Sequence, residues 1–156
     1  MTKTITIAPV RKTLTVNATQ AHAFTVFTGG IDRWWPKTHQ LGKAPLARTV
    51  IEPRQGGRWY TIHEDGEEIT VGHMLVWDEP NRIVFSWEID SEWKPDAKVA
   101  SEVEVRFTAE GTNVTRVELE HRKFEVLGEA GGEKMRSDVG GGWPRILDLF
   151  KQEAEA

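Results

Sequence analysis

An amphipathic segment near the C-terminus constrains the fold more than any other feature of this chain. Large apolar residues recur there at helical spacing, so that they share one face: Met135, Val139, Trp143, Ile146, Leu147 and Phe150. Pro144 follows three glycines and cannot donate a backbone hydrogen bond to Gly140. We therefore expect two helical segments, at about 133–139 and 142–154. Their apolar face has to be covered by the rest of the chain.

Most of the preceding chain is predicted to form strands, because apolar and polar residues alternate along it. In the clearest case, Ile83, Phe85 and Trp87 share one face of a strand at 82–89. The predicted strands are 10–16, 46–53, 58–63, 68–77, 82–89, 102–108 and 114–121. Turn signals such as Asp65-Gly66 separate several of them, which favours antiparallel pairing.

Two short helices are expected between the first and second strands, at 20–28 and 31–35, separated by Gly29-Gly30 and ended by Pro36. Loops are expected at 37–45, 90–100, 109–113 and 122–132. This order predicts an α+β fold, in which a curved seven-stranded antiparallel sheet wraps round a long C-terminal helix. We expect a single domain over residues 1–156, with its core at about 10–154.

Composition excludes several classes of function. The net charge is -4, and the 20 basic residues are mixed with 24 acidic ones, so no basic face for nucleic acid is expected. The chain has no cysteine, which excludes disulfides and thiol chemistry. The first residues contain no apolar run long enough for a signal peptide or membrane span, and we expect a cytoplasmic protein.

Several local motifs, taken together, carry a resemblance to a known family. They are Ile31-Asp32-Arg33-Trp34-Trp35-Pro36, Gly56-Gly57-Arg58-Trp59, Gly72 to Trp77 followed by Glu79 to Trp87, and Gly142-Trp143 with Leu147 and Leu149. In order and spacing the chain resembles the helix-grip superfamily, which includes steroid-transfer-related lipid-binding domains, the birch pollen allergen and polyketide cyclases. Within it, the chain is most similar to homologues of the activator of the heat-shock-protein-90 ATPase.

This resemblance implies a helix-grip fold with an apolar small molecule held between sheet and helix, and it implies no cofactor. The eukaryotic activators use the domain as part of a co-chaperone, so a chaperone partner follows from family analogy alone. The sequence departs from the common pattern in the Gly-rich connection 122–133 and in the three glycines before Trp143, both beside the expected cavity.

No catalytic or metal constellation can be assigned from the sequence. The five histidines, at positions 22, 39, 63, 73 and 121, form no metal-binding spacing, so no metal is expected. A nucleophile elbow and a phosphate-binding loop are both missing. His121 shares the inward parity of Val117 and Leu119, where a satisfied structural histidine competes with a ligand or proton-transfer role.

Aromatic residues form the best candidate site, because seven tryptophans stand against one tyrosine. Six aromatic side chains are predicted to face one interior space: Trp35, Trp59, Phe85, Trp87, Phe107 and Trp143. Leu147 joins them from the C-terminal helix, and the candidate polar groups are Thr61, His73 and His121, with Arg33 near a mouth. The competing interpretation is that these aromatics only fill the core.

Three interpretations of function remain open. Because no acid–base pair can be named, we favour non-catalytic binding of an apolar, aromatic or lipid-like molecule. A polyketide cyclase or aromatase-like enzyme using the same cavity is the alternative, and a co-chaperone-like interaction module is the third. The sequence identifies neither the ligand nor the oligomeric state, so a homodimer stays open.

Overall fold

Seven strands form one antiparallel sheet, as predicted, in the computed structural model, which describes residues 5–38 and 41–156. The strands are β1 (Val10–Val16), β2 (Leu46–Ile51), β3 (Arg58–His63), β4 (Glu68–Asp78), β5 (Arg82–Trp87), β6 (Ser101–Gly111) and β7 (Val114–Arg122). Their order across the sheet is β1-β7-β6-β5-β4-β3-β2. Residues 39 and 40 of the predicted 37–45 loop lie outside the described residues.

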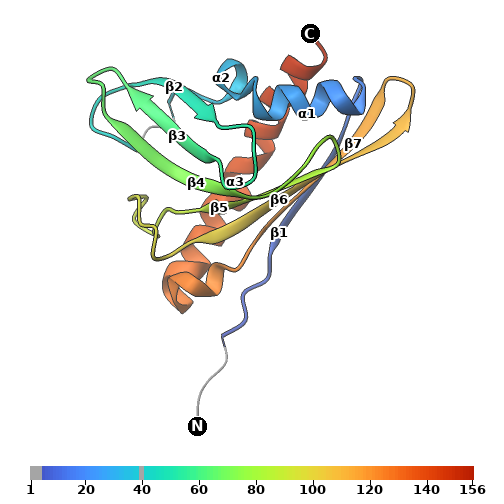
Figure 1. Cartoon of the computed structure of the whole chain (residues 1–156). Coiled ribbons are helices and arrows are strands. Elements are labelled where there is room, and N and C mark those ends of the chain that lie inside the picture. The colour runs from blue at the N-terminus through green and yellow to red at the C-terminus, as the bar shows by residue number, and fades with distance from the viewer. Residues whose placement is uncertain (1–4, 39–40) are drawn as a thin grey trace.

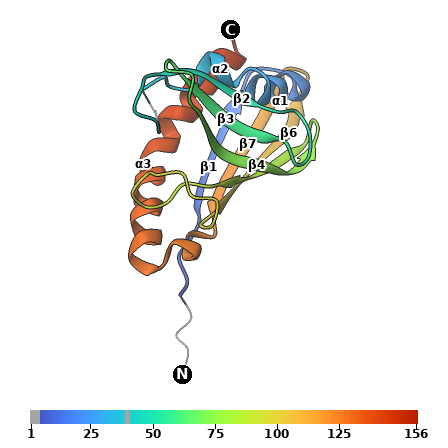
Figure 2. The ribbon, with the colours of Figure 1, turned by 60° about the vertical axis from the view of Figure 1, so that its left-hand side comes forward.

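The helices close the concave side of this sheet. α1 (Gln20–Thr28) and α2 (Ile31–Trp34) join β1 to β2, and the short η1 (Phe124–Leu127) leads from β7 into α3 (Glu129–Ala154). α3 contacts the edge strand β1, and α2 contacts both α3 and the opposite edge strand, β2. The sheet therefore curls from one edge to the other around the side on which α3 lies (Figures 1 and 2). This is the helix-grip arrangement that the resemblance implied.

α3 is one continuous helix, so the predicted division into 133–139 and 142–154 is wrong. Pro144 removes one backbone hydrogen bond, but the apolar face keeps its register on both sides of it. Met135, Val139, Trp143 and Phe150 are all buried, and burial of this whole face outweighs the cost of a single interrupted bond. The helix also begins earlier than predicted, within the connection expected to be a loop.

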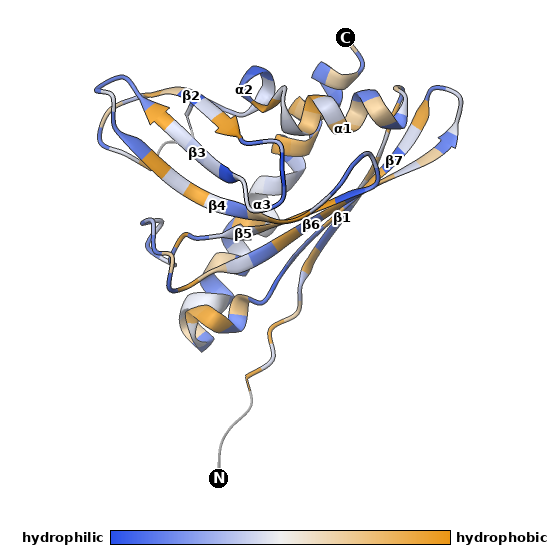
Figure 3. Ribbon diagram, viewed as in Figure 1, coloured by the Kyte–Doolittle hydropathy of each residue, from blue (hydrophilic) through white to orange (hydrophobic). Residues whose placement is uncertain are grey.

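Alternation along the strands places apolar side chains on the concave face. Ile83, Phe85 and Trp87 of β5 are at most 4% exposed, and β6 and β7 contribute buried residues at matching positions. Phe85 pairs with Val103, which in turn pairs with His121, so these three side chains form one row across the sheet. Figure 3 shows apolar and polar residues alternating along the strands. The core lies between this face and the helices.

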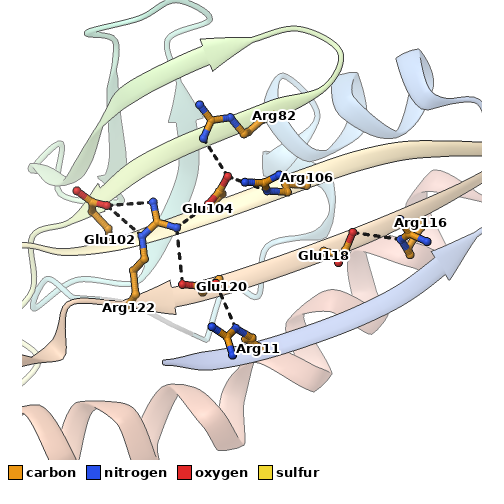
Figure 4. Close-up of polar contacts among 9 residues, drawn as sticks. All are labelled: Arg11, Arg82, Glu102, Glu104, Arg106, Arg116, Glu118, Glu120 and Arg122. Carbon is orange, nitrogen blue, oxygen red and sulfur yellow. Dashed lines mark hydrogen bonds and ion pairs between the residues drawn. The ribbon is translucent and has the colours of Figure 1, made fainter. Parts of the chain in front are cut away.

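The outer face of the sheet carries a network of arginine and glutamate side chains instead (Figure 4). Its centre is Glu104, whose side chain is only 8% exposed and accepts from Arg82 and Arg106 at 2.9 Å and from Arg122 at 2.5 Å. Glu104 lies directly opposite Glu120, a like-charge pair that would destabilise the sheet without these arginine partners. Burial alone would raise the pKa of Glu104, but the hydrogen bonds from Arg122 and Arg82 outweigh it and lower that pKa.

Over residues 5–38 and 41–156, the chain contains no helix with the length and apolar character needed to cross a membrane.

Candidate functional site

A cavity of about 420 Å³ lies between α3, the inner face of β3 to β5 and the segments that follow α2 and β5. This volume falls within the range of about 300–1,000 Å³ typical of small-molecule sites. Its wall is formed by Trp35, Thr38, Leu41, Thr61, Val71, Trp87, Ile89, Trp93, Asp138, Val139, Gly142, Trp143 and Ile146. Among these described residues, only Thr38, Thr61 and Asp138 carry a hydroxyl or a carboxylate.

The indoles of the wall and of the layer behind it pack on one another, mostly edge to face. Trp35 meets Trp59 at 5.0 Å between ring centroids with an interplanar angle of 90°. Trp87 lies 5.8 Å from Trp143 and 5.9 Å from Trp59. Such edge-to-face pairs each stabilise the packing by about 0.5–1.5 kcal/mol beyond the area buried. These contacts restrict the rotation of the indoles that form the wall.

The buried indole N–H groups differ in whether they are satisfied. Trp59 donates to Thr49 Oγ1 at 2.8 Å, and Trp143 donates to His121 Nδ1 at 3.1 Å. The buried Nε1–H of Trp87 has no acceptor among the described residues. A buried donor without a partner is costly, and this nitrogen is fully enclosed by the surrounding side chains.

His121 lies beneath the wall and holds Trp143 in place. Its Nδ1 accepts from Trp143, so Nε2 carries the proton of the neutral ring and donates to Ser101 Oγ at 2.8 Å. The ring also lies against Phe124, with 4.7 Å between centroids. Burial in these apolar surroundings lowers the pKa of His121 to about 3. His121 is therefore a neutral, fully hydrogen-bonded support for the indole.

Thr61 connects the cavity wall to a second buried histidine. Its Oγ1 lies 3.1 Å from His63 Nε2, and His63 Nδ1 lies 2.9 Å from the carbonyl oxygen of Ala44. His63 is 2% exposed and stands two residues after Thr61 on β3, on the same face as Trp59. Sequence reasoning did not select His63 for the site, although this shared parity was a signal that pointed to it.

The loop after β5 is tied to α3 beside the cavity. Trp93, which is 37% exposed, donates from Nε1 to Asp138 Oδ2 at 3.0 Å, and its ring lies 6.2 Å from that of Trp87. Lys134 contacts the same carboxylate and donates to the carbonyl oxygen of Ser91 at 2.6 Å. The hydrogen bond from Trp93, together with Lys134, lowers the pKa of Asp138. These contacts hold the loop as part of the cavity wall.

Four of the predicted site residues lie on the cavity wall: Trp35, Thr61, Trp87 and Trp143. Five others are buried elsewhere in the core: Trp59, Phe85, Phe107, His121 and Leu147. Trp59 and His121 lie behind the wall, against Trp35 and Trp143 respectively. Phe107 packs on Phe24 and Phe27 of α1. Arg33 is exposed and lies near Glu153 at 3.9 Å, outside the wall.

His73 was expected in the cavity, but it lies on the opposite face of the sheet. Its Nδ1 is 2.7 Å from Glu88, and its backbone N–H donates to Ser86 Oγ at 2.8 Å. The reason is a bulge: Trp59 pairs with Gly72 while Tyr60 pairs with Thr70, so β4 contains one extra residue. An extra residue reverses the side-chain alternation, which leaves Val71 on the wall and turns His73 away. At Gly72 a Cβ would stand 1.7 Å from Ser86 O, so only glycine fits there.

No group of three or more His, Asp or Glu side chains in the described chain is arranged to hold a metal ion. The cavity wall offers aromatic surface and a few hydrogen-bonding groups, and these residues suit a flat, mostly apolar molecule.

Comparison with known proteins gives both a family match and structural neighbours. The family model described as Activator of Hsp90 ATPase homolog 1-like protein matches residues 5–155. An anthrahydroquino-gamma-pyrone synthase, Txn09, is 40% identical with a TM-score of 0.67, over 94% of this chain and 96% of that one. No curated protein matches the chain.

Two further solved structures come from Micromonospora echinospora. CalC, described as a self-sacrificing resistance protein, is 36% identical with a TM-score of 0.67, over 94% of this chain and 93% of that one. CalU16 is 22% identical with a TM-score of 0.63, over 95% of this chain and 76% of its own, and this likeness supports the fold alone.

Proposed function

Because the chain belongs to the family of Activator of Hsp90 ATPase homolog 1-like proteins, we propose that it binds a small molecule between its sheet and α3. The ligand is a flat, largely apolar aromatic compound, and the protein acts as a binding module. The observation that carries this proposal is the cavity of about 420 Å³, four of whose lining residues are tryptophans. Indole faces and edges offer broad apolar contact to a planar ring system.

Two polar features would orient such a ligand. Thr38 carries a hydroxyl on the segment that follows α2. Thr61 adds a hydroxyl from β3. A polycyclic compound with carbonyl and hydroxyl groups on its rim fits this pattern better than a saturated lipid chain, which offers no acceptor.

One of the similar solved structures supports an aromatic polycyclic ligand. Txn09 is named as a synthase of an anthrahydroquino-gamma-pyrone, which is a fused planar ring system. The identity of 40% with a synthase also favours a second candidate function, in which the same cavity guides ring closure in a bound aromatic precursor. Turnover of such a precursor would separate this enzyme from a binding module.

Binding can be tested by filling the cavity from α3. Gly142 lies on the wall, and a Cβ added there meets no atom within 4 Å. Gly142→Phe therefore places a side chain into the cavity without a backbone clash. Gly141 has equally open surroundings but is exposed and off the wall, so Gly141→Phe is the matched control.

The probe is alizarin, a dihydroxyanthraquinone, followed by tryptophan quenching and by calorimetry. We expect saturable binding to the wild type and to Gly141→Phe, and at least about tenfold weaker binding to Gly142→Phe. 2-Naphthol is the second probe. The proposal would be overturned if neither alizarin nor 2-naphthol bound saturably to the wild type. Equal affinity of the two variants would exclude this cavity as the site.

A further inference from the structure

The pair of Thr61 and His63 has a geometry that simple packing does not require. A histidine that is 2% exposed stands at the end of β3, behind a threonine of the cavity wall. Both ring nitrogens have partners within hydrogen-bond distance, Ala44 O for Nδ1 and Thr61 Oγ1 for Nε2. Activated hydroxyl groups are found in a common arrangement. The hydroxyl lies within about 2.6–3.2 Å of a base, and a third group orients that base.

The carbonyl of Ala44 determines the tautomer of the neutral ring. A carbonyl oxygen only accepts, so His63 Nδ1 must carry a proton and donate it to Ala44 O at 2.9 Å. In neutral His63, Nε2 is then a free acceptor that faces Thr61 Oγ1 at 3.1 Å. The Thr61 hydroxyl therefore donates to His63, which makes its oxygen more able to accept a proton from elsewhere.

The same surroundings also accommodate the protonated ring. In the imidazolium form, Nε2–H donates to Thr61 Oγ1, and the Thr61 hydroxyl proton turns to the carbonyl oxygen of Ile69 at 3.4 Å. Glu67 Oε1 and His63 Cε1 both flank the position of a Cβ built on Gly42, at 2.9 and 3.1 Å, so a carboxylate lies on the same side of the pair as Gly42. Both protonation states thus leave every donor of the pair with an acceptor.

We infer that Thr61 and His63 form a proton-transfer pair for an acidic hydroxyl group on the aromatic ligand. The inference rests on the proposed function, because it takes the cavity as the binding site. The ligand O–H bond breaks and its proton goes to Thr61 Oγ1, while the original Thr61 proton goes to His63 Nε2. The products are a bound phenolate and an imidazolium, and the reverse steps restore the starting state. No other reactant is needed.

This role identifies the ligand class as aromatic compounds with a weakly acidic hydroxyl on the ring rim, such as hydroxyquinones. A ring hydroxyl placed against Thr61 would lie in a cavity whose wall is otherwise largely tryptophan, which suits an aromatic ring. His63 acts through Thr61 and does not itself line the cavity, so it is a positioning and proton-accepting residue. Its contribution has to be read from the ionisation state of the ligand.

The experiment again uses alizarin, whose visible absorption spectrum shifts when its hydroxyl group ionises. Quenching of tryptophan fluorescence measures binding separately. The proteins are the wild type, His63→Gln, Thr61→Val and the control His73→Gln, which alters the opposite face of the sheet. Spectra are recorded about one pH unit below the pKa of free alizarin, where the free probe is mostly protonated.

We expect bound alizarin to be largely ionised in the wild type and in His73→Gln. In His63→Gln and Thr61→Val the ionised fraction should fall about tenfold or more with binding retained. If either folded variant showed the same ionised fraction as the wild type, this inference would be overturned, while the proposed function would stand. If His63→Gln fails to fold, the near-isosteric Thr61→Val decides. No binding to the wild type would overturn the proposed function, and this inference with it.

Discussion

Acid should destabilise this protein through His121 well before its carboxylates are protonated. The pKa of this buried ring is lowered from 6.5 to about 3 by desolvation, while in the unfolded chain it returns to its ordinary value. Between these values the unfolded state binds a proton that the folded state does not, so stability present above pH 6.5 is lost as the pH falls. The loss is about 1.4 kcal/mol for each pH unit in this window. From pH 6.5 to about 4.5, His121 alone should remove about 2.5 kcal/mol.

Urea denaturation at a series of pH values, followed by circular dichroism, measures this loss. His121→Gln cannot titrate, so its free energy of unfolding should fall about 2.5 kcal/mol less over the same window, although its stability at pH 7 is lower. His22→Gln, which changes a histidine at an exposed position, is the control. A pH dependence of His121→Gln that matches the wild type would refute the argument, because the ring would then be charged in the folded protein.

Two further predictions concern stability at neutral pH. Gly141→Ala in α3 should raise the free energy of unfolding by about 0.5–1 kcal/mol, since alanine favours the helix and its Cβ meets no atom within 4 Å. Gly132→Ala should lower it instead, because its Cβ would lie 2.4 Å from Phe124 O, and thermal unfolding of both variants checks the pair. Glu104→Gln should cost about 1–3 kcal/mol by denaturant titration, since it removes the charge that three arginines contact. The same change at Glu118, whose side chain is 43% exposed, should cost less than about 1 kcal/mol.

The strands could be predicted because one face of each is buried. Val103, Val105 and Phe107 alternate with polar neighbours, and this two-residue period identifies the buried face of the strand. Continuity of α3 could not be predicted in this way. Local chemistry at Pro144 favours a break, and only the tertiary burial of the apolar face on both sides of it decides otherwise.

The site was partly predictable, because strand parity gives the face of a residue but not its depth. Phe85 and Trp87 share a face, yet only Trp87 reaches the cavity. The bulge in β4 that turns His73 outward depends on the pairing of two strands, which no single segment encodes. Trp93 lies in a polar loop with no periodicity, so its place on the wall follows from the fold alone.

The contiguous indoles also couple the fluorescence of most of the tryptophans. Neighbouring rings among six of the seven tryptophans lie 5.0–6.3 Å apart: Trp34, Trp35, Trp59, Trp87, Trp93 and Trp143. At such spacings, excitation absorbed by one indole migrates to the others before emission. One bound ligand that absorbs visible light would then quench the emission of all the coupled tryptophans. For the same reason, replacing one tryptophan would change the total emission intensity by an amount that differs strongly from one seventh.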